Sequence, residues 1–237
     1  MSSELLILAG TTASIGFLHT LLGPDHYLPF IVMARSGRWS LNKTVWITVL
    51  CGTGHVAGSL LLGITGIAFG VAITKLDALE SFRGDFAAWA LIAFGLVYAC
   101  WGLRRVLRNQ PHEHSHIHAG GNQHSHSHIH TDRHAHVHGE DGPRKVTPWV
   151  LFTIFVFGPC EPLIPLLMYP AAKSSVLGLT LVAGIFYVVT LVTMSGIVVI
   201  STLGVNLLPL TRMERYVHVL AGGSICLCGV SIKIFGL

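Results

Sequence analysis

The stretch HTLLGPDH, residues 19–26, interrupts an apolar segment near the start of the chain, and GPCEP, residues 158–162, interrupts another in the second half. Each places Gly-Pro beside a carboxylate in the middle of a segment long enough to cross a bilayer. Proline breaks a helix, and the freed backbone groups can then line a pathway. Ionisable groups at that depth are costly and typically mark a substrate or ion route. The pair therefore predicts a transporter built from two repeats.

The composition is that of an integral membrane protein. Of 237 residues, 51% are apolar and only 11% are charged, with a mean hydropathy of +0.64. Soluble domains have about 25% charged residues. The net charge of +4 is small, and the basic residues lie at segment ends rather than in a patch, which argues against nucleic acid as a partner. The lipid bilayer is the expected surrounding.

Six segments have the run of about 20 apolar residues that a bilayer span requires. They cover roughly residues 5–34, 44–73, 86–106, 148–171, 175–203 and 214–236. We predict an all-α integral membrane fold of six transmembrane helices, arranged as 3+3 inverted repeats with broken first and fourth helices. Residues 1–106 form the first repeat, 148–237 the second, and 107–147 the loop between them. Asp77, Glu80 and Asp85 then fall in a short loop, where exposure to solvent explains them.

Lysine and arginine counts predict the orientation. The loops after spans one, three and five hold eleven of the fifteen basic residues. The other side holds only Lys75, Arg83, Lys173 and Lys233. By the positive-inside rule, the long loop is cytoplasmic and both termini are extracytoplasmic. The expected location is the inner (cytoplasmic) membrane, as a multi-pass protein.

The long loop is rich in histidine. Eleven of the fifteen histidines lie in residues 112–138, mostly as alternating His-x-His. They are His112, His114, His116, His118, His124, His126, His128, His130, His134, His136 and His138. Imidazole nitrogens suit Ni, Co, Cu and Zn, so we predict a metal-collecting or sensing segment, disordered without metal. A pH-responsive linker stays open as an alternative.

Donor groups inside the spans predict a metal site. Small residues around His55 permit close helix contact, which would bring His55 against the first broken helix. Mixed nitrogen, sulfur and oxygen donors do not favour Mg or Ca, which prefer oxygen alone. Alternatives remain: His55 as a helix–helix hydrogen-bond partner, Cys160 as a packing residue, Glu161 as a proton carrier. The predicted metal-binding residues are His19, Asp25, His26, His55, Cys160 and Glu161.

These motifs resemble the nickel/cobalt transporter superfamily. His19-x5-Asp25-His26, Gly54-His55, the GPCEP stretch and the His-rich loop are together similar to NicO-type proteins, UreH-like membrane proteins and nickel/cobalt permeases, within a wider LysE-like superfamily. The permease signature is usually His-x4-Asp-His, so the spacer here is one residue longer. The resemblance implies that His19, Asp25, His26 and His55 recognise the metal. The assignment of Cys160 and Glu161 as metal-binding residues depends mainly on the correspondence between the two repeats.

We therefore predict a secondary transporter of Ni(II) or Co(II), with two repeats that rock around a central site. It is not an enzyme and needs no cofactor, because the metal is the transported ligand. Binding requires neutral imidazoles, so acid pH should weaken it. Uptake is favoured by the UreH-like resemblance, with metallochaperones or metalloenzyme maturation proteins as downstream partners. Efflux through the same site stays open, and so does oligomerisation.

Two further functions compete with transport. A thiol-disulfide electron carrier like the CcdA/DsbD membrane domain also uses paired proline-broken helices, but it needs a reactive cysteine on each. Cys160 lies on the fourth span, whereas the first span has no cysteine. A metal-sensing membrane protein without transport would keep the His-rich loop, but it would not need two carboxylate-bearing breaks.

Overall fold

The computed structural model describes residues 3–108, 112–117, 123–128, 147–207 and 215–235. Apart from one two-stranded hairpin, these residues are almost entirely helical. The helices are α1 (Ser3–Leu22), the short 3-10 helix η1 (Pro24–His26), α2 (Leu28–Gly37), α3 (Leu41–Ala68), α4 (Ile73–Arg108), α5 (Thr147–Phe157), α6 (Leu163–Ala172), α7 (Val176–Leu207) and α8 (Val217–Phe235). The strands are β1 (His112–Ile117) and β2 (Gln123–His128).

The helices have the length and composition of a multi-pass membrane protein. Within the described residues, five are long and apolar enough to cross a membrane: α1, α3, α4, α7 and α8. The shorter apolar helices α5 and α6 follow one another directly. Large apolar side chains point outward, with Ile7 70%, Trp46 74% and Ile200 73% exposed. Such an apolar exterior is stable in lipid, where the helices satisfy their own backbone hydrogen bonds.

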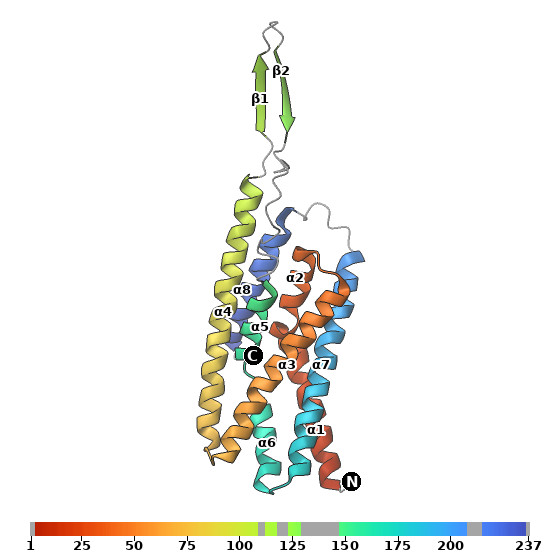
Figure 1. Cartoon of the computed structure of the whole chain (residues 1–237), viewed down its shortest axis with the longest axis vertical. Coiled ribbons are helices and arrows are strands. Elements are labelled where there is room, and N and C mark those ends of the chain that lie inside the picture. Colours follow the sequence, from red (N-terminus) through yellow and green to blue (C-terminus); the bar gives the residue numbers. More distant parts are fainter. Residues whose placement is uncertain (1–2, 109–111, 118–122, 129–146, 208–214, 236–237) are drawn as a thin grey trace.

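The two interrupted segments run in opposite directions through the bundle. In Figure 1, α1 and α6 lie at the lower end and α2 and α5 lie above them. The interruption between α1 and α2, residues 23–27, is called the first break below, and that between α5 and α6, residues 158–162, the second break. Both breaks line one cavity. The fold therefore brings two stretches together that are far apart in the sequence.

Helices α4 and α8 pack side by side along much of their length (Figure 1). Their contact depends on glycines at facing positions. A Cβ atom at Gly95 would lie 2.4 Å from the Cys226 nitrogen, and one at Gly222 would lie 2.6 Å from the Gly95 oxygen. The two backbones thus touch directly, as small residues allow in membrane helix pairs. This pair forms the wall behind the cavity.

Helix α4 begins earlier than the sequence led us to expect. It begins at Ile73, so the predicted start at residue 86 and the placement of Asp77, Glu80 and Asp85 in a loop are wrong. The residue Glu80 is only 1% exposed. The reason is helical periodicity: Leu76, Glu80 and Ala87 recur on one buried face. Because Glu80 is charged, the sequence of this buried stripe resembled that of a solvent-exposed loop.

Residues 112–117 and 123–128 of the histidine-rich loop form a hairpin in the structure, and the disorder expected of the loop without metal stays a prediction. β1 and β2 pair antiparallel, with the Cα atoms of His112, His114 and His116 opposite those of His128, His126 and His124. The alternation of His-x-His has a period of two residues, which is also the period of a strand. The hairpin extends beyond the upper end of α4 in Figure 1, away from both breaks. His118, His130, His134, His136 and His138 lie outside the described residues.

Candidate metal centre

A short 3-10 turn in the first break brings His26 toward His19. Gly23 still donates its N–H to the His19 oxygen, at 3.1 Å. Pro24 has no N–H and begins the short turn of η1, in which the His26 N–H donates to the Gly23 oxygen at 3.1 Å. The helix therefore ends at Leu22. The centroids of the His19 and His26 rings end up 4.7 Å apart.

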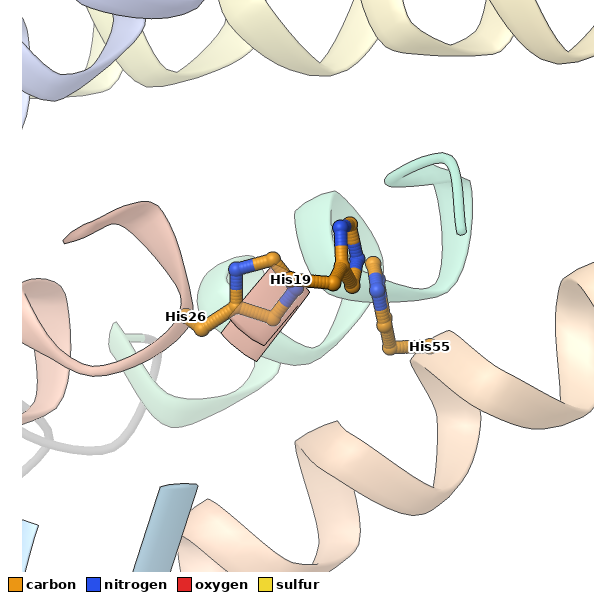
Figure 2. Close-up of side chains that lie close together, drawn as sticks. All are labelled: His19, His26 and His55. Atoms are coloured by element: carbon orange, nitrogen blue, oxygen red, sulfur yellow. The ribbon is translucent and has the colours of Figure 1, made fainter. Parts of the chain in front are cut away.

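His55 completes a cluster of three imidazoles. It lies at the middle of α3, buried at 3% exposure, with its ring centroid 4.9 Å from that of His26. One ring nitrogen from each of His19, His26 and His55 lies within 4.8 Å of the others. Figure 2 shows the three rings gathered side by side. Three nitrogens bound to one transition ion lie roughly 3.3 Å apart, given bonds of 2.0–2.1 Å. A small inward movement would therefore let them share an ion.

The rings of His26 and His55 are held on one side and unpartnered on the other. His26 Nδ1 lies 3.2 Å from the Asp25 carboxylate and 3.2 Å from the Gly23 oxygen. His55 Nδ1 lies 3.4 Å from the Phe155 oxygen. The Nε2 atom of each ring is buried and has no hydrogen-bond partner among the residues that the structure describes. Metal-binding histidines show this arrangement, because a carboxylate or carbonyl fixes Nδ1–H and leaves Nε2 for the ion.

The glycine of each break lies against one of these Nδ1 atoms. A Cβ atom at Gly23 would lie 2.6 Å from His26 Nδ1 and 2.9 Å from Asp25 Oδ1. A Cβ atom at Gly158 would lie 3.0 Å from His55 Nδ1. The side chain of any other residue would push the imidazole away. Each Gly-Pro pair thus ends a helix and also leaves room for a site histidine.

The cluster borders a cavity of about 350 Å³. Its lining is mainly apolar and comes from α1, α3, α4, α5, α8 and both breaks. The polar groups in it are His19, Asp25, His26, His55 and Glu161. A low-dielectric cavity with few convergent polar groups is a typical small-ligand site. An ion in this cavity would meet three imidazoles and two carboxylates.

The structure places the two predicted residues of the second half at different depths. Cys160 is fully buried, and its Sγ lies 3.9 Å from His19 Nε2, which puts the thiol beside the cluster. Glu161 is exposed and lines the cavity, but it is not part of the three-histidine cluster. Another histidine of the second half, His218 at the start of α8, is not part of the cluster. Its Nδ1 lies 2.9 Å from the hydroxyl of Tyr98 on α4.

Sequence reasoning missed three residues that hold the second break: Ser59 on α3, and Glu80 and Arg83 on α4. They are called the Ser59–Glu80–Arg83 network below. The available clue was the i,i+3 spacing of Glu80 and Arg83 in a segment whose apolar residues recur at helical intervals. Their partners are backbone groups near residues 156–160, which no sequence pattern reveals.

Comparisons of the chain with protein-family models, with curated proteins and with solved structures give no match.

Proposed function

We propose that this protein is a secondary transporter of divalent transition metal ions, with His19, His26 and His55 as the binding residues. The observation behind this proposal is the pair of buried, unpartnered Nε2 atoms on His26 and His55. A buried polar atom without a partner costs about 1–3 kcal/mol. A metal ion at the point where the three rings converge would supply the missing partner. Two of the rings that would hold it, His26 and His55, already have their Nδ1 atoms fixed.

The donor set favours a class of ions. Imidazole nitrogens suit Co(II), Ni(II), Cu(II) and Zn(II), whereas Mg and Ca prefer oxygen ligands. Asp25 acts here mainly on His26, and Cys160 is the nearest soft donor. Within that class, nickel and cobalt are proposed on the resemblance of His19-x5-Asp25-His26 and Gly54-His55 to the nickel/cobalt transporters.

The arrangement of the helices supports transport rather than static storage. We count α1–η1–α2 and α5–α6 as broken first and fourth spans, which gives six spans in 3+3 inverted repeats. In this arrangement α1–η1–α2 corresponds to α5–α6, α3 to α7, and α4 to α8, and the packing agrees with that correspondence. α3 packs on α5 and α6, α7 packs on α1 and α2, and α4 and α8 pack on each other. In such folds the ion binds at midplane between the repeats, which then expose it to alternate sides.

We propose uptake across the cytoplasmic membrane, with the histidine-rich loop on the cytoplasmic side. Incoming ions would pass from the central site to the loop and then to metallochaperones or metalloenzyme maturation proteins. Efflux through the same site is the competing direction. A thiol-disulfide carrier would need a cysteine in the first broken span; this chain has none there, and Cys160 lies beside His19 instead.

The test is accumulation of radioactive nickel and cobalt in cells that express the wild-type chain, Asp25→Asn or His26→Ala. His218→Ala is the matched control, since it removes an imidazole that lies outside the cluster. An importer predicts extra accumulation in wild type and His218→Ala, and loss of it in both site variants. Reduced accumulation that the site variants restore would indicate efflux. Equal accumulation in all strains, at confirmed expression, would contradict nickel or cobalt transport.

A further inference from the structure

The Ser59–Glu80–Arg83 network is a charged cluster that the three-histidine site does not include. Arg83 Nη1 donates to Glu80 Oε1 at 2.5 Å, and the Glu80 side chain is only 2% exposed. Ser59 donates to Glu80 Oε2 at 3.1 Å and accepts from Arg83 Nη1 at 3.3 Å. A buried ion pair is weak evidence for stability, because desolvation offsets much of its attraction. Inside a membrane protein, such a pair is by default functional.

The network binds the backbone of the second break. Arg83 Nη2 donates to the Val156 oxygen at 2.9 Å and to the Gly158 oxygen at 3.3 Å. The Cys160 N–H donates to Ser59 Oγ at 3.1 Å and to Glu80 Oε2 at 3.2 Å. A helix interruption leaves such groups without helical partners, and lipid offers none. Side chains of α3 and α4 therefore satisfy the groups that the break exposes.

The neighbouring sequence leaves space for these contacts. A Cβ atom at Gly58 would lie 2.7 Å from Arg83 Nη2 and 2.9 Å from the Val156 oxygen. A Cβ atom at Gly84 would lie 2.9 Å from Pro159 Cγ. Glycine is thus required on both helices for the guanidinium and the proline to approach. The glycines of α3 and α4 therefore leave the space in which the second break packs.

The same backbone also holds His55. Its Nδ1 lies 3.4 Å from the Phe155 oxygen, one residue before the carbonyl that Arg83 binds. Gly158, whose oxygen accepts from Arg83, lies against that Nδ1 atom. Ser59 follows His55 by one turn on the buried face of α3. A shift of residues 155–158 would therefore move the acceptor that orients the His55 ring.

We infer that Glu80 and Arg83 are positioning residues for metal binding, which act through the second break to orient His55. This inference rests on the proposed function. The inference extends the proposed function, because it assigns a role to the buried Glu80–Arg83 ion pair: the orientation of the His55 ring. His26 lies in the first break, where the contacts of its Nδ1 atom are local, so it should respond much less to the network.

The test is titration of the purified full-length protein with Co(II), whose absorption bands report its ligands. Glu80→Gln keeps the side-chain shape and removes the charge. We expect it to weaken Co(II) binding by about 10- to 100-fold, the range for residues that orient a metal ligand. Asp85→Asn is the matched control, because Asp85 lies on the same helix as Glu80 and forms an exposed ion pair with Lys233 of α8, at 2.6 Å. It should leave affinity unchanged.

Double-mutant cycles separate positioning from general stability. In a His55→Ala background, Glu80→Gln should cost little further affinity, because the ring that it orients is gone. In a His26→Ala background, the full loss should persist, because the contacts that orient His26 are local. Equal losses in both backgrounds would overturn the inference, since they would indicate a general effect on the fold. Unchanged affinity in Glu80→Gln would overturn it as well.

Arg83→Lys gives a second route if Glu80→Gln fails to fold. It keeps the positive charge beside Glu80 but loses the planar fork that reaches two carbonyls. The same pair of cycles applies, with the same expected outcomes. If the wild-type protein binds neither Co(II) nor Ni(II), the proposed function fails and the inference fails with it. If the wild type binds and the variants bind equally well, only the inference fails.

Discussion

The two helix breaks have the same Gly-Pro pair beside a carboxylate, but different parts of the chain hold them. In the first break, Asp25, His26 and Gly23 contact one another within four residues. In the second break, the backbone of residues 156–160 is bound by side chains from α3 and α4. The first break contributes the His26 imidazole to the site, whereas the end of α5 and the second break contribute the Phe155 oxygen beside His55 and the Cys160 thiol beside His19. One sequence motif thus has two different roles, which its tertiary surroundings determine.

The largest expected effect comes from an alanine in the first break. In Gly23→Ala, the new Cβ atom would lie 2.6 Å from His26 Nδ1 and 2.9 Å from Asp25 Oδ1. We expect the His26 ring to be displaced and Co(II) or Ni(II) affinity to fall by about 10- to 100-fold. Competition titration of the purified protein measures this. Gly10→Ala on α1, where a Cβ atom would meet nothing within 4 Å, is the control. Equal affinity for both variants would refute the local assembly of the first break.

An alanine in the second break should have a smaller effect. In Gly158→Ala, the Cβ atom would lie 3.0 Å from His55 Nδ1 and 3.2 Å from the Phe155 oxygen. These contacts are less severe than those at Gly23, so a loss of about tenfold, the lower end of the range, is expected. The loss should disappear in a His55→Ala background. A loss that persists there would show that the second break acts on the site by another route.

The smallest effect should follow removal of the Cys160 thiol, which belongs to the second break and lies beside His19. Cys160 Sγ lies 3.9 Å from His19 Nε2. Cys160→Ser should lower affinity by less than about tenfold. It should lower affinity for Cd(II), a soft ion, more than affinity for Ni(II), because thiolate ligands select soft metals. Titration with both ions gives the ratio. An unchanged ratio would mean that Cys160 packs beside the site without binding metal.

The sequence predicted the first break better than the second for a physical reason. Asp25 and His26 are neighbours, so their contact follows from a short turn that Gly23 and Pro24 impose. Glu80 and Ser59 are 21 residues apart, and Cys160 is 80 residues from Glu80. Contacts at such separations depend on how helices pack, and a buried charge resembles a loop residue until its partner is known. Glu80 was misplaced for that reason.

The sequence by itself determined that the chain is apolar enough for a membrane, where its helices break, and that His19, Asp25 and His26 belong together. It also indicated His55 as a donor, because small residues surround it on α3. Only the tertiary structure decided that the three imidazoles converge within 4.8 Å and that two Nε2 atoms remain without partners. It alone gave Glu80 and Arg83 their partners. Local geometry follows from residue type and spacing. The partners of a buried charge are backbone groups distant in the sequence, and only helix packing brings them into contact.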